Sequence, residues 1–153
     1  QTQTYGAAAR GGAARSDVIV SEEKITYPQV TAPDIMVVFT LEAMKKYQNE
    51  LKPDALLIFD SSLFTPPEGT PFRIYGCPAT GIAMNELGKG IVANMVMLGF
   101  LTALTGIVSE EAITEAIRAN VPKGTEELNL KAFRRGMELA GEEKNVSRRD
   151  AEG

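Results

Sequence analysis

Residues 5–16 carry the side chains best suited to binding an anionic ligand. The Gly11-Gly12 pair lets the backbone approach a ligand closely. Arg10 and Arg15 could clamp a phosphate, and Ser16 could donate a hydrogen bond to it. The segment has neither the lysine and spacing of a P-loop nor the GxGxxG pattern of a dinucleotide site. The alternative is a hairpin loop whose glycines adopt unusual dihedral angles and whose arginines are solvated.

Two features of the composition further restrict the reactions that this chain could catalyse, namely the lack of histidine and the presence of one cysteine. The sequence has no histidine, which excludes imidazole bases, triads built on imidazole and most zinc sites. Its one cysteine, Cys77, cannot hold an iron–sulfur cluster or form a disulfide within the chain, so we expect any redox centre on a partner in a reducing, cytoplasmic setting. Cys77 lies between Gly76 and Pro78, and we expect a buried apolar side chain there, with a reactive nucleophile as the alternative.

Size, composition and charge limit the class of protein. The 153 residues fit one domain, and 44% hydrophobic with 24% charged residues is typical of a soluble protein. No apolar run approaches the roughly 20 residues that cross a bilayer, so we expect no membrane segment. A net charge of −4 argues against nucleic acid as a partner, because binding a phosphate backbone requires a basic face.

The middle of the chain has the pattern of an open α/β sheet. Apolar runs at Ile35–Phe39 and Ala55–Phe59 predict buried strands, and a helix is expected over Leu41–Leu51 between them. This order predicts a βαβ unit with parallel strands. A short strand is expected at Phe72–Tyr75. Asp60–Ser62 follow a strand where such sheets bind ligands, but turn and cap chemistry explains them equally well, so they stay outside the candidate site.

The two ends of the chain are predicted to differ, with a hairpin at the N-terminus and a flexible tail at the C-terminus. Gln1–Tyr5 alternates as a strand does, and the β-branched run Asp17–Ser21 predicts a second strand, which together suggest a hairpin with a long loop. Residues 141–153 contain Val146 as their one large apolar residue, so we expect a flexible tail.

The second half of the sequence is helical. Helices are expected at Ala79–Leu87 and Ile91–Leu104, the second apolar nearly all round with Gly106 as its C-cap. Ser109 and Thr125 each precede two glutamates and are expected to cap two amphipathic helices. The predicted fold is therefore α/β, a three-layer Rossmann-like open sheet with flanking helices, an N-terminal β-hairpin and a helical C-terminal half.

Four ordered stretches resemble one protein family. They look like the gamma subunit of 2-oxoacid:ferredoxin oxidoreductases, especially the 2-oxoglutarate type, within the pyruvate/ketoisovalerate oxidoreductase catalytic-domain family. The likeness extends from Thr2 to about Ala140. The stretches are Thr2–Gly6 continuing through Arg10–Gly12 and Arg15–Ser21, Ile91–Gly99, Leu104–Ser109, and Val121–Thr125 with Lys131–Phe133.

The resemblance implies an activity for the assembled enzyme. Members of this family oxidise a 2-oxoacid with coenzyme A to an acyl-CoA, carbon dioxide and reduced ferredoxin. They use thiamine diphosphate and iron–sulfur clusters, and the resemblance implies that the gamma subunit holds neither. The implied partners are the alpha and beta subunits, a delta subunit as a further candidate, and ferredoxin as electron acceptor. No catalytic or metal-binding residue is implied for this chain.

The resemblance also implies a site. In fused members of the family the equivalent domain lies beside coenzyme A, and the hairpin that matches residues 5–16 belongs to that neighbourhood. The candidate coenzyme A contacts carried over are Arg10, Gly11, Gly12, Arg15 and Ser16, with Tyr5 as a packing or hydrogen-bonding partner. Paired arginines suit the phosphates of coenzyme A.

Differences from the family's pattern accompany the resemblance. The family carries a strand and a Gly-Gly-Gln-Gly loop before its Gln-Thr-Gln segment, whereas this sequence begins at Gln1, so either the chain is truncated or that portion is absent. We therefore expect residues 1–140 to be a gamma-type domain lacking its first strand-helix unit. Ala7, Ala8 and Ala14 stand where the family often has Pro, Glu and Ser, which implies a looser or less polar loop.

Two functional hypotheses of different classes follow. One is an obligate subunit that helps to form the coenzyme A site of a larger oxidoreductase. The other is a free-standing module that binds coenzyme A or another phosphorylated metabolite. Independent catalysis ranks third, because without histidine the chemistry would depend on arginine, tyrosine or isolated acids.

Overall fold

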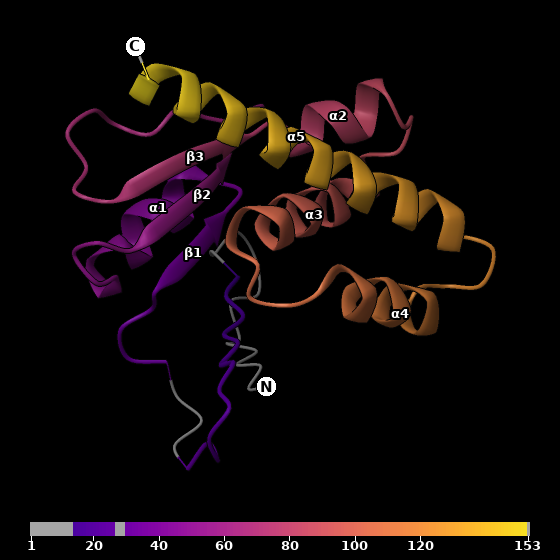
Figure 1. Ribbon diagram of the computed structural model, residues 1–153, viewed down its shortest axis with the longest axis horizontal. Coiled ribbons are helices and arrows are strands. Elements are labelled where there is room, and N and C mark those ends of the chain that lie inside the picture. The colour runs from indigo at the N-terminus through magenta and orange to yellow at the C-terminus, as the bar shows by residue number, and fades with distance from the viewer. Residues whose placement is uncertain (1–13, 27–29, 153) are drawn as a thin grey trace. The chain divides into compact units, whose positions relative to one another are not determined.

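The computed structural model describes residues 14–26 and 30–152 (Figure 1). Within these ranges the chain forms an α/β fold whose C-terminal half is helical, as predicted. In chain order the elements are β1 (Ile35–Val38), α1 (Leu41–Tyr47), the 3-10 helix η1 (Gln48–Glu50), β2 (Leu56–Asp60), β3 (Arg73–Cys77), α2 (Ala79–Asn85), the 3-10 helix η2 (Gly90–Val92), α3 (Ala93–Thr105), α4 (Glu110–Asn120) and α5 (Glu126–Glu152).

The strands form one open, three-stranded sheet in the order β1-β2-β3. β1 and β2 are parallel, with Ile35 opposite Leu56 and Val38 opposite Phe59. Parallel neighbours need a crossover between them, and α1 with η1 provides it. The βαβ unit predicted from the two apolar runs is therefore confirmed.

β3 extends the sheet on the other side of β2. The backbone N–H of Arg73 donates to the carbonyl of Ala55 at 3.1 Å, before β2 begins. At the far end, the N–H of Ser61 donates to the carbonyl of Cys77 at 3.0 Å. Because both strands advance in the same direction between these two bonds, β3 is also parallel to β2. The carboxyl ends of β2 and β3 consequently lie at the same edge of the sheet.

Helix α1 begins where the sequence indicates and ends earlier. The hydroxyl of Thr40 accepts a hydrogen bond from the N–H of Ala43 at 3.2 Å, as an N-cap does. The predicted helix continued to Leu51, but the α-helix ends at Tyr47 and the chain tightens into η1. Pro53 disfavours helical backbone in Lys52, the residue before it, which explains why no helix continues past Leu51; it does not explain the earlier change to a 3-10 turn after Tyr47.

The described chain divides into two compact units, one comprising the chain to Phe59 with Phe64–Tyr75, the other Asp60–Leu63 with the chain from Gly76 onward. Each unit buries apolar side chains of its own. In the first unit one core cluster is formed by the buried residues Val38, Met44, Leu51, Ala55 and Leu57. In the second unit one core cluster is formed by Ile117, Leu130 and Phe133.

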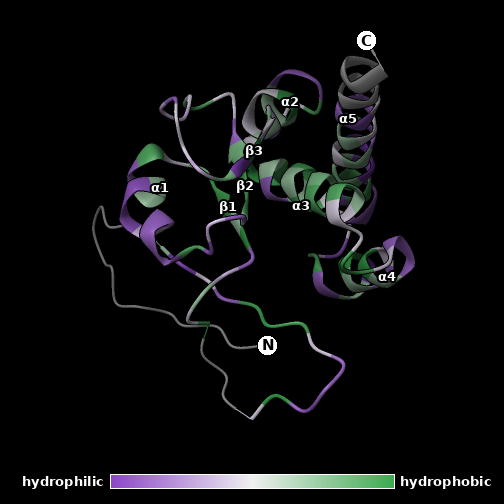
Figure 2. Ribbon diagram, turned by 60° about the vertical axis from the view of Figure 1, so that its left-hand side comes forward, coloured by the Kyte–Doolittle hydropathy of each residue, from purple (hydrophilic) through white to green (hydrophobic). Residues whose placement is uncertain are grey.

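Helices α3 and α5 dominate the second unit and approach each other closely. In Figure 2 most of α3 is coloured as hydrophobic, whereas α4 combines hydrophobic and hydrophilic residues. A Cβ atom built on Gly99 would lie 1.9 Å from the carbonyl oxygen of Phe133, and one built on Gly136 would lie 1.9 Å from that of Val96. The crossing of these two helices therefore depends on glycine in both.

Two of the three caps predicted in this half are confirmed, and α5 begins at Glu126, directly after Thr125, as predicted. Gly106 ends α3 with a φ of 65°, a left-handed conformation that glycine adopts without strain. The hydroxyl of Ser109 caps α4 by accepting from the N–H of Ala112 at 3.2 Å. The cap predicted at Thr125 is wrong, because its hydroxyl instead donates to the carbonyl of Pro122 at 2.6 Å.

The predicted N-terminal hairpin is not present in the described part of the chain. Its first strand, Gln1–Tyr5, lies outside the described residues. In the second, Asp17 forms an isolated bridge and residues 18–21 are in no strand. Val18 and Val20 are 58% and 62% exposed, so this β-branched run lacks the burial that a strand in a sheet provides.

The C-terminal segment is helical where no regular structure was expected. α5 continues through residue 141 to Glu152, and the side chains of residues 141–144 are exposed. Glutamate, lysine, arginine and alanine are good helix formers, so a helix already begun in the core can continue through them. The prediction that residues 141–153 are flexible concerns motion and stays a prediction.

Candidate functional site

Arg15 is the described residue of the candidate site with the most contacts. Its Nε donates to Oδ1 of Asp17 at 2.7 Å, and its Nη1 donates to Oε2 of Glu50 at 2.5 Å. The guanidinium carbon also lies 5.1 Å from the centre of the Tyr47 ring, a cation–π arrangement. The hydrogen bond to Asp17 raises the pKa of Arg15, partial burial opposes this, and the bond to Glu50 raises the pKa further.

The elements of the first unit explain why these groups meet. Arg15 and Asp17 lie two residues apart in a segment whose residues alternate between exposed and partly buried, and both are among the partly buried ones. Tyr47 ends α1, and Glu50 ends η1. The 3-10 turn that follows α1 carries Glu50 to the guanidinium. We call these four residues, Arg15, Asp17, Tyr47 and Glu50, the Arg15 cluster.

Only part of the candidate coenzyme A site falls in the described chain. Ser16 is exposed, beside Arg15, and makes no hydrogen bond to another described side chain. The other candidates lie outside the described residues, so their relation to Arg15 stays a prediction. These are Tyr5, Arg10, Gly11 and Gly12.

Sequence reasoning missed the partners of Arg15. Asp17 is close enough in sequence to suggest a local ion pair. Glu50 lies 35 residues away, and nothing in a single sequence distinguishes it from the other exposed glutamates. The interaction therefore becomes visible only once α1 and η1 are placed.

A second polar cluster lies at the carboxyl edge of the sheet. Asp60 is fully buried, and its carboxylate accepts from the N–H of Ser62 at 2.9 Å, the N–H of Thr80 at 2.9 Å and the hydroxyl of Thr80 at 2.6 Å. The hydroxyl of Ser62 accepts from the N–H of Gly81 at 2.9 Å. These are the contacts of the turn-and-cap interpretation, in which Asp60 joins the end of β2 to the start of α2.

The single thiol is not poised for chemistry. Cys77 ends β3 with none of its surface exposed, as expected for a buried apolar residue. Burial raises its pKa to about 12, with smaller contributions from the charges of Asp60 and Glu143. A nucleophilic cysteine needs the opposite, a lowered pKa and access to solvent.

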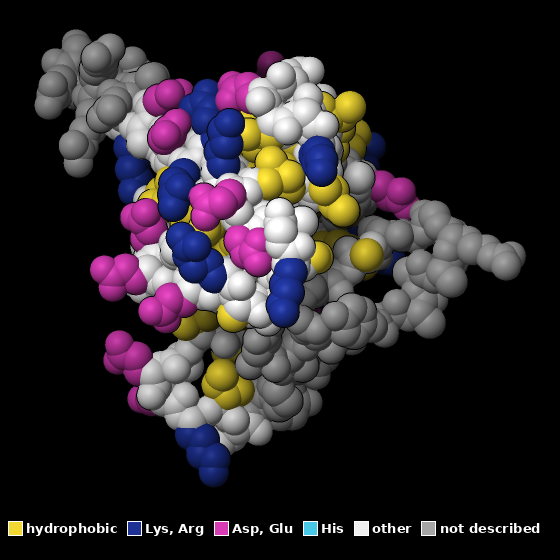
Figure 3. Space-filling view, turned by 90° about the vertical axis from the view of Figure 1, so that its right-hand side faces the viewer, with side chains coloured by type: hydrophobic (Ala, Val, Ile, Leu, Met, Phe, Trp, Pro, Cys, Tyr) yellow, Lys and Arg dark blue, Asp and Glu magenta, His cyan; other side chains and the backbone are white. Residues whose placement is uncertain are grey.

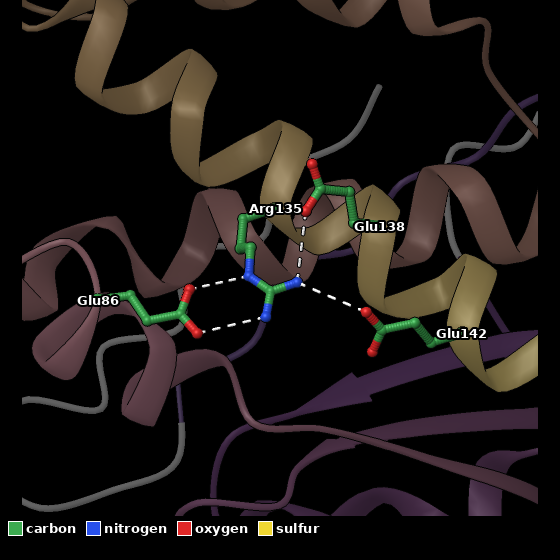
Figure 4. A network of polar contacts seen from close by, with 4 residues as sticks. All are labelled: Glu86, Arg135, Glu138 and Glu142. Carbon is green, nitrogen blue, oxygen red and sulfur yellow. Dashed lines mark hydrogen bonds and ion pairs between the residues drawn. The ribbon is translucent and has the colours of Figure 1, made fainter.

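The most connected charge of the second unit is Arg135 (Figure 4). Its Nε donates to Glu86 at 2.8 Å and its Nη2 to the same carboxylate at 3.3 Å, so α5 is joined to α2 by a two-point contact. Glu138 at 3.4 Å and Glu142 at 3.9 Å complete the network from α5 itself. The hydrogen bond from Arg135 lowers the pKa of Glu86. These side chains are paired with one another at the protein surface, which indicates a structural role.

The described residues do not fit an iron–sulfur cluster or a metal ion. Within residues 14–26 and 30–152, no group of three or more His, Cys, Asp or Glu is placed to hold a metal. The complete sequence has one cysteine, which cannot supply the several thiolates that a cluster requires. Among the described helices, none is long and apolar enough to cross a bilayer.

On the face drawn in Figure 3, basic and acidic side chains are interspersed around hydrophobic ones, with no large area of a single sign. Exposed large apolar residues of the second unit include Met84 at 60% and Ile91 at 83%. Contiguous apolar patches mark surfaces that meet another protein, whereas single exposed apolar side chains are normal, so these two residues do not by themselves indicate an interface.

Comparison with known proteins matches almost the whole chain to one family. The model of the pyruvate ferredoxin/flavodoxin oxidoreductase family matches residues 1–139. A 2-oxoglutarate synthase subunit KorC from Methanocaldococcus jannaschii is 47% identical, over 93% of this chain and 77% of the relative.

Two solved structures share the fold. The gamma subunit of a keto/oxoacid ferredoxin oxidoreductase from Geobacter sulfurreducens is 40% identical, with a TM-score of 0.78, over 91% of this chain and 78% of that one. A 2-oxoglutarate:ferredoxin oxidoreductase from Magnetococcus marinus, solved with 2-oxoglutarate, coenzyme A and succinyl-CoA bound, is 25% identical, with a TM-score of 0.63. That match covers 84% of this chain and 22% of the longer one.

Proposed function

Because the chain belongs to the pyruvate ferredoxin/flavodoxin oxidoreductase family, we propose that it is the gamma subunit of a 2-oxoglutarate:ferredoxin oxidoreductase. The observation that carries the proposal is the 47% identity to a 2-oxoglutarate synthase subunit along 93% of the chain. The 40% identity to a gamma subunit supports the same assignment. The chain is thus a subunit of an oxidoreductase, and its work is done in a complex.

The proposed reaction is the oxidative decarboxylation of a 2-oxoacid, with 2-oxoglutarate as the favoured substrate. The bond between the oxo carbon and the carboxylate breaks and carbon dioxide leaves. The acyl group joins the sulfur of coenzyme A, whose thiol loses its proton to the solvent, and the pair of electrons released passes to ferredoxin. Thiamine diphosphate and iron–sulfur clusters supply the carbon and electron chemistry, and we assign both to the partner subunits. The proposed partners in the cytoplasm are the alpha and beta subunits, with a delta subunit as a further candidate, and ferredoxin as the electron acceptor of the complex.

Within that complex, we assign this chain to assembly and to the coenzyme A site. The candidate contacts are Tyr5, Arg10, Gly11, Gly12, Arg15 and Ser16. The relative with coenzyme A and succinyl-CoA bound supports a site of this kind in the family. Chemically, guanidinium groups beside glycines suit the phosphates of coenzyme A, because arginine donates in pairs and glycine allows close approach.

The subunit assignment is tested by purifying the tagged chain from its native host under gentle conditions and identifying the recovered polypeptides by mass spectrometry. We expect larger chains that bind thiamine diphosphate and iron–sulfur clusters. Recovery of the chain alone, with measurable affinity for coenzyme A, would instead support a free-standing binding module.

The site assignment is tested in the assembled complex with Arg10→Ala. Loss of a charged phosphate contact should raise the KM for coenzyme A by about tenfold, as expected for a hydrogen bond between charged groups, and leave the KM for the 2-oxoacid unchanged. Arg134→Ala is the matched control, because Arg134 is an exposed arginine on α5 with no ion pair to a described residue. An unchanged KM for coenzyme A in Arg10→Ala would remove residue 10 from the site.

A further inference from the structure

The Arg15 cluster has a geometry that the coenzyme A assignment does not explain. Two of the three guanidinium nitrogens are used inside the protein, Nε by Asp17 and Nη1 by Glu50. Among the described residues, no hydrogen bond or ion pair engages the third, Nη2. The side chain of Arg15 is 25% exposed, so the guanidinium is held in one orientation and still reaches solvent.

The two carboxylates differ in what they can fix. Asp17 is two residues from Arg15 and moves with it, so this bond orients the guanidinium relative to its own segment. Glu50 is 35 residues away on η1, so its bond fixes Arg15 relative to α1 and the sheet that α1 connects. The ring of Tyr47, one turn before Glu50, supports the flat face of the guanidinium at 5.1 Å. Together they hold one nitrogen ready for a ligand.

We propose that Glu50 is a positioning residue of the coenzyme A site, which fixes Arg15 so that its Nη2 faces a phosphate of coenzyme A. This inference rests on the proposed function. Preorganisation of this kind increases affinity because the side chain is ordered before the ligand arrives. Glu50 itself makes no contact with coenzyme A and acts through Arg15.

The charges of the Arg15 cluster make the direction of the change in coenzyme A affinity a test of the proposal. Arg15 carries one positive charge, whereas Asp17 and Glu50 together carry two negative charges. If Glu50 affected coenzyme A only through its charge, removing that charge would strengthen the binding of a phosphate. Positioning predicts the reverse, namely weaker binding when Glu50 no longer holds the guanidinium.

The experiment measures steady-state kinetics of the complete complex that contains Glu50→Gln, Arg15→Gln, or both substitutions. Glu50→Gln should raise the KM for coenzyme A by about fivefold, which corresponds to about 1 kcal/mol for an ion pair, while kcat at saturating coenzyme A is kept. The double variant should match Arg15→Gln alone, since Glu50 acts through Arg15. Glu68→Gln is the matched control, because Glu68 is an exposed glutamate of the same unit with no ion pair to a described residue.

The outcomes separate the two levels of the proposal. If Arg10→Ala raises the KM for coenzyme A and Glu50→Gln leaves it unchanged or lowers it, the coenzyme A site stands and the positioning role of Glu50 is wrong. Additive effects of Arg15→Gln and Glu50→Gln would also overturn it, because Glu50 would then act independently. If Arg10→Ala, Arg15→Gln and Glu50→Gln all leave the KM unchanged, the site assignment fails together with the inference. Calorimetric titration of coenzyme A into the assembled complex checks the same order of affinities without turnover.

Discussion

Asp60 carries a carboxylate into the protein interior without a cationic partner among the described side chains. Two backbone N–H groups and one hydroxyl, from Ser62 and Thr80, donate to it instead. Hydrogen bonds to a charged group are stronger than those between neutral groups, and three of them offset much of the cost of taking the charge out of water. The same bonds fix the start of α2 against the end of β2.

We expect Asp60→Ala to lower the free energy of unfolding by about 3 kcal/mol, because buried donors lose their acceptor and a cavity remains. Asp54→Ala, at an exposed aspartate in the loop before β2, should change it by less than about 0.5 kcal/mol. Urea unfolding followed by circular dichroism measures both. Equal effects of the two substitutions would show that the bonds to Asp60 contribute little.

Burial of Cys77 predicts a dependence of stability on alkaline pH. The folded protein keeps the thiol proton up to a pKa of about 12, whereas the ordinary value is 9.0. As pH rises from about 9 toward about 12, the unfolded chain releases this proton first, so the folded state loses about 1.4 kcal/mol of stability per pH unit from this group. Below pH 9 the thiol is protonated in both states and contributes no pH dependence.

Unfolding of the wild type and Cys77→Ala in urea at a series of alkaline pH values measures this slope. The stability of Cys77→Ala should fall less steeply, since the other titrating groups are shared. A disulfide reagent should also label Cys77 slowly in native buffer and rapidly in urea. Parallel pH curves for the two proteins would contradict a buried, protonated thiol.

At the residue scale, sequence reasoning predicts chemistry that depends on residue type and fails where two distant segments must meet. The burial of Cys77 between Gly76 and Pro78 follows from the local pattern and is confirmed. The ion pair of Arg15 with Glu50 forms only when α1 and η1 are folded, so no local sequence pattern predicts it.

At the scale of elements, ends are predictable when a side chain or glycine near the boundary determines them. Thr40 and Ser109 accept hydrogen bonds from helix N–H groups, and Gly106 takes the left-handed conformation. Thr125 has the same local pattern as Ser109, yet its hydroxyl donates a hydrogen bond to the carbonyl of Pro122 instead of capping the helix. At Asp17–Ser21 the β-branched pattern predicts a strand, yet only Asp17 forms a bridge and the valines are exposed, so propensity alone does not determine strand formation.

The crossing of α3 and α5 could not be predicted from the sequence, although it depends on two glycines. A glycine inside a helix normally costs stability, so its presence calls for a packing reason. Here the reason is backbone contact, because a side chain on Gly99 or Gly136 would meet a carbonyl oxygen of the other helix. Neither hydrophobic pattern nor spacing identifies which helices cross at these positions.

Gly136→Ala should lower the free energy of unfolding by about 3 kcal/mol, because the new methyl group forces α3 and α5 apart. Gly141→Ala, further along the same helix, has open space around the new carbon and should raise it by up to about 1 kcal/mol through helix propensity. Thermal unfolding of both variants measures this contrast of sign. If Gly136→Ala were also stabilising, the close crossing would be wrong.

At the scale of the whole molecule, the residue types that the sequence lacks restrict the function more than the fold does. An open α/β sheet supports many functions, so the fold alone would not select one. The absence of histidine and the single cysteine restrict this chain's own chemistry, and the family match then supplies a reaction in which other subunits can do the rest.

This division of labour gives a prediction for the isolated chain. Mixed with coenzyme A, 2-oxoglutarate and oxidised ferredoxin, the purified protein should reduce ferredoxin no faster than buffer does, because it has no imidazole base, one buried thiol and too few thiolates for a cluster. Adding the larger subunits of its complex should restore ferredoxin reduction, which is measured as a loss of ferredoxin absorbance. A complex that lacks only this chain should need a higher concentration of coenzyme A to reach its half-maximal rate. Ferredoxin reduction by the chain alone would contradict the subunit assignment, whereas an unchanged coenzyme A requirement without it would leave assembly as its role and remove it from the coenzyme A site.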